Sequence, residues 1–186
     1  TLSSSSAASD VYKRQPIPCI LCENVKGLYS HNFGQTFATI YGVLTNLNYT
    51  IECQLVNTKW WLPQNRERIY IFGRYNGNPS GRKVFPIYNS NEEDKKTSGE
   101  SNYTPRNTRT ITTAHAHGTS TNMSYIKKGK KVRRLTCVET CRLQGFPDDW
   151  NDCCSDTQRY KQMGNAVSVP VTEAIFRKIY EKKTLH

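Results

Sequence analysis

"HNFGQTFATIYGVLTNLNYTIECQLVNT", residues 31–58, is the stretch that decides the fold, because a helical pattern in it gives way directly to a strand pattern. Large apolar residues in its first part recur at spacings of four, three, four and three, which places them on one face of a helix. These residues are Phe33, Phe37, Ile40, Leu44 and Leu47. In its second part, Ile51, Cys53 and Leu55 alternate with polar residues, which predicts a strand.

Two flanking segments extend this pattern. The apolar run Cys19–Leu21 lies just before a Glu-Asn-Val triplet and predicts a short buried strand. The segment "RIYIFGR", Arg68–Arg74, is rich in the β-branched and aromatic residues that are typical of strands. The order strand, helix, strand, strand predicts part of an α/β sheet domain.

Two further helices are predicted nearer the C-terminus. In "LTCVETCRLQGFP", residues 135–147, Thr136 and Glu139 have the spacing of a capping box, and Gly145 marks the C-terminal end of the helix. The segment "GNAVSVPVTEAIFRKIYEKK", which starts at Gly164, predicts a terminal helix with one apolar face. That face carries Val171, Ala174, Ile175 and Ile179.

The 186 residues carry a formal net charge of +11, and most of this surplus lies in one segment. Residues 76–134 contain 12 Lys or Arg against 4 Asp or Glu, a net +8, which leaves +3 for the remainder. Gly, Pro, Ser, Asn and Thr dominate this segment as far as residue 122, which predicts irregular structure. We therefore expect a polyanionic partner there, with nucleic acid ahead of an anionic membrane surface. No run is long and apolar enough to predict a membrane span.

The seven cysteines are an odd number without a regular framework spacing, which favours reduced thiols in a cytosolic setting. One interpretation is a zinc site formed by Cys19, Cys22, Cys137 and Cys141. Against that interpretation, residues three apart in a strand point to opposite faces. The alternative is that these cysteines are small buried apolar residues.

The first fifteen residues, "TLSSSSAASDVYKRQ", are rich in Ser and Ala and show no periodicity. Residues 10–15 resemble the translation of a sequencing-library adapter. We expect residues 1–15 to be an artefactual leader outside the fold, the alternative being a genuine flexible leader.

Three polar motifs lie where chemistry is possible, although each alone has a plainer interpretation. Gln64, Arg66 and Arg68 alternate along a predicted strand, so they present donors for a phosphate or a base carbonyl, or else an exposed edge of charges. Glu23 follows an apolar strand, where ligands bind in open α/β sheets, or where a simple turn lies. The pair beginning at Gly164 predicts a tight turn, with or without a ligand close to its backbone.

Taken together and in order, "ENVKGL", "QNRERIYIFGR", "RRLTCVETCRLQGFPDDW" and "QRYKQMGNAVSVPV" resemble the later motifs of the DNA cytosine C5-methyltransferases. The resemblance runs from about Pro18 to the terminal helix. It implies an α/β fold: part of a Rossmann-like, S-adenosylmethionine-dependent methyltransferase domain with a small, irregular target-recognition lobe. Residues 16–75 would belong to the catalytic domain and 76–134 to the recognition segment. Residues 135–186 would form the small-lobe helix and the helix that returns to the catalytic domain.

The resemblance also implies roles for single residues. Glu23 would hold the flipped cytosine through its amino group and ring N3, and Arg68 would contact the base carbonyl and the neighbouring phosphate. Arg66 and Gln64 would support the pocket, with Arg66 counted among the catalytic residues. Asn165 and Val167 would line the S-adenosylmethionine site. Residues expected at the DNA are Gln64, Thr110, Lys127, Lys128, Lys130, Lys131 and Arg133. Residues expected to organise the small lobe are Arg142 and Gln144.

Two parts of the family pattern are missing from this sequence. There is no Phe-x-Gly-x-Gly loop after a first strand, and no Pro-Cys motif upstream of Glu23 in a strand of its own. Cys19 follows a proline but lies in the strand that ends at Glu23, so it is not expected to be the nucleophile, and the chain alone is expected to be inactive. No metal is expected.

The implied parent is a monomeric DNA cytosine C5-methyltransferase of a restriction–modification or phage system, acting on double-stranded DNA in the cytoplasm, at the nucleoid, with no membrane partner. Two alternatives remain: a non-catalytic DNA-binding subunit of a split enzyme, and an RNA cytosine C5-methyltransferase.

Overall fold

A computed structural model describes residues 16–76, 82–88, 108–113, 125–128 and 131–181. The chain forms two compact units, Thr1–Gln54 with Ile69–Phe85, and Leu55–Arg68 with Pro86–His186. Each unit therefore combines two separate stretches of sequence. The divisions expected from the sequence, after residues 75 and 134, stay a prediction.

The first unit is built on three strands and one helix, with two short 3-10 turns between β1 and the helix. The elements are β1 (Cys19–Val25), η1 (Lys26–Tyr29), η2 (His31–Gly34), α2 (Gln35–Asn46), β2 (Tyr49–Asn57) and β4 (Glu67–Tyr75). The strand order is β1-β4-β2. The amide of Tyr75 donates to Pro18 O (3.0 Å) and that of Asn76 to Asn48 O (2.9 Å), so the end of β4 lies beside the starts of both neighbours. The central strand is therefore antiparallel to both, and the predicted order of elements is confirmed.

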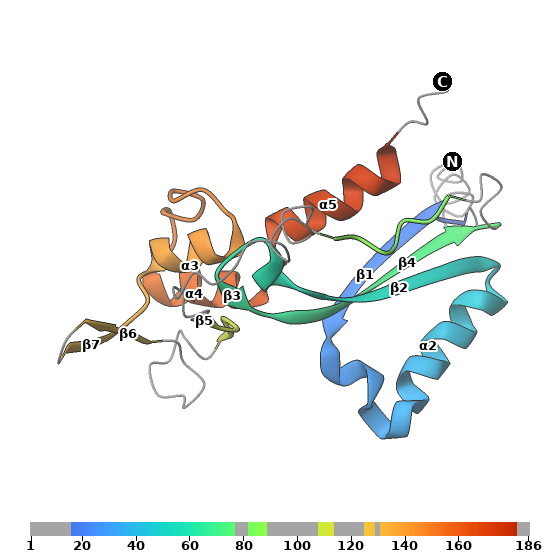
Figure 1. Cartoon of the computed structure of the whole chain (residues 1–186), viewed down its shortest axis with the longest axis horizontal. Helices are drawn as coiled ribbons and strands as arrows, with labels where there is room; N and C mark the ends of the chain where they lie inside the picture. The colour runs from blue at the N-terminus through green and yellow to red at the C-terminus, as the bar shows by residue number, and fades with distance from the viewer. Residues whose placement is uncertain (1–15, 77–81, 89–107, 114–124, 129–130, 182–186) are drawn as a thin grey trace, which may run out of the picture. The chain divides into compact units, whose positions relative to one another are not determined.

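One face of this sheet is covered by α2 (Figure 1). Leu28, Ile69 and Ile71 form the buried cluster on that face, and Phe37 and Ile40 of the helix pack against it. Burying an aliphatic side chain of this size contributes about 1.5–3 kcal/mol, so these contacts are the main reason why the helix stays on the sheet.

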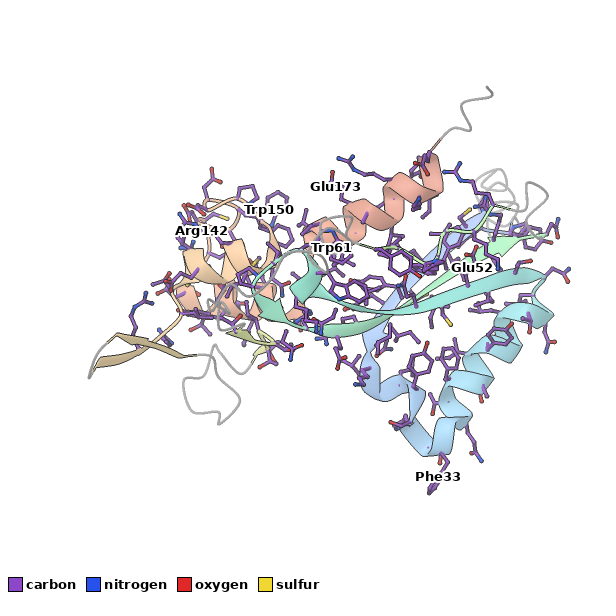
Figure 2. The ribbon with its side chains drawn as sticks, in the orientation of Figure 1. Phe33, Glu52, Trp61, Arg142, Trp150 and Glu173 are labelled. Carbon is purple, nitrogen blue, oxygen red and sulfur yellow. The ribbon has the colours of Figure 1, made fainter. Side chains whose placement is uncertain are left out.

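The predicted apolar helix face is wrong at both ends, because Leu47 lies just after the helix and is 56% exposed, and Phe33 lies before it. The helix begins at Gln35, and Asn32, Phe33 and Gly34 before it have φ values of 49°, 54° and 85°. Phe33 is fully exposed and points away from the helix (Figure 2). The physical reason is the run of left-handed residues, which breaks the helical frame, and such a φ is uncommon for a bulky side chain.

The strand β1 exists as predicted, but it is less buried than expected. Cys19 and Cys22 are exposed, and Ile20 and Leu21 are half-buried. The strand lies at an edge of the three-stranded sheet, where it has only one neighbour. The interpretation of the cysteines as small buried residues is therefore wrong for this pair, whereas Cys137 is buried as that interpretation expects.

The second unit holds short strands, one 3-10 turn and three helices. The elements are η3 (Thr58–Trp60), β3 (Gln64–Asn65), β5 (Thr108–Arg109), β6 (Tyr125–Lys128), β7 (Lys131–Arg134), α3 (Cys137–Gln144), α4 (Asp156–Asn165) and α5 (Val169–Tyr180). The strands β3 and β5 pair in parallel, and β6 and β7 form an antiparallel hairpin. The helices α3 and α4 lie side by side (Figure 1).

The helix α3 begins and ends as the sequence predicts. Thr136 accepts a hydrogen bond from the Glu139 amide (3.2 Å), and the Glu139 carboxylate accepts one from the Thr136 amide (2.8 Å), which completes the capping box. Gly145 ends the helix with φ 82°. Leu143, on the buried side of the helix, packs with Ile111 and Leu135 in the core of this unit.

The terminal helix α5 buries part of its predicted face, since Val171 and Ile175 have almost no exposed surface. Pro170 lies in its first turn, where the missing amide costs no hydrogen bond. Across the described ranges, no helix combines the length and apolar character that a membrane crossing requires.

Gly145 provides the first testable prediction. A Cβ at this position would lie 2.7 Å from Pro170 Cδ, and its φ is strained for any residue with a side chain. We expect Gly145→Ala to lower the free energy of unfolding by about 2 kcal/mol or more in a urea titration.

The matched control is Gly42→Ala in α2, where no heavy atom lies within 4 Å of an added Cβ. Removing a glycine from a helix interior is expected to stabilise the protein by up to about 1 kcal/mol. Equal effects of the two substitutions would contradict the assigned conformation of Gly145.

Candidate functional site

The buried guanidinium of Arg66 joins three segments of the second unit. Arg66 lies between β3 and β4 and is only 3% exposed. Its Nη1 donates to Ile111 O (2.9 Å), and its Nη2 donates to Ala166 O (2.9 Å). A planar guanidinium presents several donors in a fixed fork, which suits it to hold backbone carbonyls from different segments at once.

Two buried glutamines continue this arrangement. Gln64 is fully buried and its Nε2 donates to Leu143 O (3.2 Å) in the last turn of α3. Gln144 is also fully buried, and its Nε2 donates to Met163 O (2.9 Å) in α4. Buried amides of this kind fix the distance between elements, because a buried polar group without a partner costs free energy.

A pair of buried hydroxyls completes the network, and no sequence pattern predicted it. Ser168 Oγ donates to Gln144 Oε1 (2.9 Å) and lies 2.9 Å from Thr58 Oγ1. Both hydroxyl residues are nearly fully buried. Ser168 precedes α5, so its position indicates a helix cap, yet its side chain makes no capping hydrogen bond. Thr58 is 110 residues away in the chain, and no local pattern indicates such a pairing.

The network holds the connection between α4 and α5, where the two predicted cofactor residues lie. Asn165 ends α4, and Val167 lies between the two helices. Both are exposed, with 37% of Val167 accessible, whereas Ser168 beside them is 1% exposed. The connection thus exposes the amide of Asn165 and the apolar side chain of Val167, while Ser168 beside them is buried in the hydrogen-bond network.

The expectation of a tight turn at Gly164 is corrected by the structure. Gly164 is buried in the last turn of α4. A Cβ there would lie 2.5 Å from both Thr112 C and Thr113 N. The close backbone approach that requires glycine is therefore to the protein itself.

The three residues of the predicted donor row are buried to different degrees. Gln64 and Arg66 are buried and bonded within the unit, so the interpretation of the row as an exposed edge of charges is wrong. Arg68 is half-buried and its Nη1 donates to Glu67 O (2.8 Å). A DNA contact by Gln64 stays a prediction, and its burial favours the expected supporting role over that contact.

Glu23 lies in the first unit, near the end of β1, and is half-buried. Asn24 beside it is exposed, and its Oδ1 accepts a hydrogen bond from the Val25 amide (2.8 Å), which fixes the end of the strand. The place of Glu23 at the carboxyl end of a strand agrees with the sequence prediction. Its contact with cytosine stays a prediction.

Two ion pairs join α3 to the segments before and after it. Arg133 binds Glu139 through two hydrogen bonds of 2.7 Å, and Arg142 binds Asp148 through bonds of 2.8 and 2.6 Å. The hydrogen bonds from Arg133 hold the pKa of Glu139 at about 2, against an ordinary value of 4.5, although burial acts in the opposite direction. The hydrogen bond from Arg142 likewise lowers the pKa of Asp148.

The structure describes only some of the remaining residues that are predicted to contact DNA. Thr110 donates through its hydroxyl to Asn65 O (2.8 Å). Lys127, Lys128 and Lys131 lie in the β6–β7 hairpin, whose lysine side chains are outside the described part, and Lys130 is itself outside the described residues. DNA binding by these residues stays a prediction.

Comparison with known protein families decides the identity. The family model "C-5 cytosine-specific DNA methylase" matches residues 11–104 and 77–181. The chain belongs to this family. The sequence motifs therefore gave the correct family, and the α/β methyltransferase fold that they implied is confirmed by the solved structures described below.

Relatives of this methylase family include two bacterial enzymes. The chain is 32% identical to the type II methyltransferase M.SsoII of Shigella sonnei over 206 aligned positions, which cover 91% of the chain and 54% of that protein. It is 33% identical to the type II methyltransferase M1.ScrFI of Lactococcus lactis subsp. cremoris, with 92% and 54% covered. The chain thus spans about half the length of these relatives.

Two solved structures share the fold at low identity. The Dnmt2 methyltransferase of S. pombe matches with a TM-score of 0.67 and 17% identity, covering all of this chain and 76% of that one. The Entamoeba histolytica methyltransferase EhMeth matches with a TM-score of 0.64 and 19% identity, covering 88% and 62%.

The lowered pKa of Glu139 predicts acid sensitivity. Because the folded-state pKa is depressed, the ion pair contributes its full stability above pH 4.5 and loses it as the pH falls towards 2. Glu139→Gln removes the charge but keeps a capping-box acceptor. We expect the variant to be less stable than the parent at neutral pH and to show a smaller loss of stability between pH 4.5 and 2 in urea titrations. An unchanged pH dependence would contradict the pairing.

Proposed function

We propose that this chain supplies the cytosine-holding and part of the cofactor-holding residues for S-adenosylmethionine-dependent methylation of cytosine C5 in duplex DNA. The observation that carries this proposal is the match of a C-5 cytosine-specific DNA methylase model to almost the whole chain. The buried network supports it, because the network fixes the α4–α5 connection while leaving Asn165 and Val167 exposed.

The cofactor S-adenosylmethionine would supply the methyl group. The exposed residues of the connection suit part of such a ligand, because Asn165 offers an amide donor and acceptor and Val167 an apolar contact. The buried hydrogen bond between Ser168 and Gln144 would hold this connection in place. Ligand binding would then cost less conformational entropy, because these two side chains are already positioned.

The cytosine would be held by Glu23 and Arg68. A carboxylic acid or carboxylate at the end of β1 can pair with the exocyclic amine and ring N3, and a guanidinium suits the base carbonyl. In the chemistry proposed, a cysteine thiolate adds to C6, the methyl group is transferred to C5, and β-elimination removes the C5 proton to a base and releases the thiolate. Cys19 lies in β1 itself, so the nucleophile is proposed to come from a segment other than this one.

Duplex DNA is the proposed substrate, and the charge of the chain and the need to extrude the base support it. Residues 76–134 carry a net +8, and Lys or Arg contacts to phosphates give sequence-independent, salt-dependent affinity. A pocket for a single cytosine requires the base to leave the helical stack, so both a basic surface and a pocket are needed. The relatives are named type II methyltransferases, which agrees with a restriction–modification context.

The experiment replaces the matched part of M.SsoII by this chain and measures transfer of labelled methyl groups from S-adenosylmethionine to duplex DNA and to transfer RNA. We expect methylated cytosine in DNA and about 100-fold slower transfer for Glu23→Gln, because the substitution removes a positioned acid–base group. The 186-residue chain alone is expected to transfer none.

The control is Glu173→Gln, an exposed side chain of α5 labelled in Figure 2, which should leave transfer unchanged. Methylation of transfer RNA in place of DNA would favour an RNA enzyme of the same fold. Methyl transfer by the 186-residue chain alone would overturn the proposal that the nucleophile comes from elsewhere. DNA binding without any transfer by the chimera would favour a non-catalytic subunit.

A further inference from the structure

Two adjacent cysteines lie at the surface of the second unit, in the turn that joins α3 to α4. Their Sγ atoms are 3.8 Å apart. Cys153 is exposed and Cys154 is half-buried, so a small reagent can reach the pair from solvent. The family pattern and the proposed reaction use neither thiol.

The separation of the two sulfurs suits a chelate better than a disulfide. Two sulfurs bound to one atom through bonds of about 2.3 Å can be at most about 4.6 Å apart, and the observed 3.8 Å lies within that limit. A disulfide has its sulfurs at about 2.05 Å and usually its Cα atoms about 4.4–6.8 Å apart, whereas adjacent Cα atoms are about 3.8 Å apart, so a bridge between neighbours is strained. The pair is therefore set to bind one thiophilic atom between its sulfurs.

The side chains around the pair restrict the kind of atom that can bind. Within the described ranges, no group of three or more His, Cys, Asp or Glu residues could hold a metal ion. The described residues around the pair therefore do not form a structural metal centre with four protein ligands. A monosubstituted trivalent arsenical needs only two thiols, because its third bond is already made to carbon.

We propose that Cys153 and Cys154 form a dithiol site for organic trivalent arsenicals of the type R–As=O. Two S–H bonds and the As=O bond break, two As–S bonds form, and the oxygen leaves with both protons as water. No electrons are transferred, so the step needs no oxidant or reductant. The product is a ring that contains arsenic and both sulfurs.

The neighbouring hydrogen bonds connect this site to α4. Gln162 Nε2 donates to Cys154 Sγ (3.5 Å), and Gln162 Oε1 accepts from Asn151 Nδ2 (3.0 Å). Asn151 is almost fully buried, so the turn is anchored from the inside. Because this anchor does not depend on the thiols, the sulfurs are held close to each other before the ligand arrives, which lowers the entropic cost of chelation.

The test uses the 186-residue chain, reduced and freed of reductant, and phenylarsine oxide as the probe. Intact-protein mass spectrometry should show a single adduct whose mass equals that of the probe less one water. The adduct should survive an excess of the monothiol glutathione and be removed by the dithiol 2,3-dimercaptopropanol. Because the second As–S bond is formed intramolecularly, Cys153→Ser and Cys154→Ser should each weaken binding by about 100-fold or more.

The matched control is Cys22→Ser. Cys19 and Cys22 are also exposed, but they are three apart in β1 and point to opposite faces, so they cannot chelate one atom. This variant should bind as the parent does. Retention of the dithiol-reversible adduct in Cys153→Ser, its loss in Cys22→Ser, or removal of the adduct by glutathione would each overturn the proposal.

Discussion

The guanidinium of Arg66 is the interaction on which the second unit depends. It is 3% exposed, and it donates to carbonyls of Ile111 and Ala166, which lie 45 and 100 residues further along the chain. An isolated buried cation is costly, and the carbonyl acceptors at Nη1 and Nη2 offset part of that cost. The β3–β4 junction, the segment after β5 and the α4–α5 connection must therefore adopt the positions that satisfy it. The glutamines and hydroxyls around it restrict the same segments further.

The need to satisfy the buried guanidinium of Arg66 explains why polar residues of the predicted donor row lie inside the protein, although their pattern suggests contact with a ligand. Gln64 donates a hydrogen bond to a backbone carbonyl of α3, and Gln144 donates one to a backbone carbonyl of α4. The hydroxyls of Ser168 and Thr58 form a hydrogen bond with each other. Their combined effect is to keep Asn165 at the surface in a fixed position. In the function that we propose, the buried polar residues position the cofactor segment, and the exposed ones contact the ligand.

The parts of the structure that the sequence predicts correctly are those controlled by local chemistry. The capping box of Thr136 and the glycine at the end of α3 act within one helix, and the segment rich in β-branched and aromatic residues forms the strand β4. The parts that it missed depend on distant partners or on a single backbone conformation. Phe33 leaves the helix face because of the left-handed run ending at Gly34, and the Thr58–Ser168 pair joins residues 110 apart.

The role of Arg66 is tested most directly by the stability of Arg66→Met relative to Arg177→Met, measured by urea unfolding with amide hydrogen exchange at residues 163–168. Arg66→Met leaves two buried carbonyls without their charged donor, so we predict a loss of about 3 kcal/mol and faster exchange in that segment. Arg177 forms an exposed pair with Glu173, and its replacement should change stability by less than about 0.5 kcal/mol. Equal stability of the two variants, with protection at residues 163–168 unchanged, would contradict the central role of Arg66.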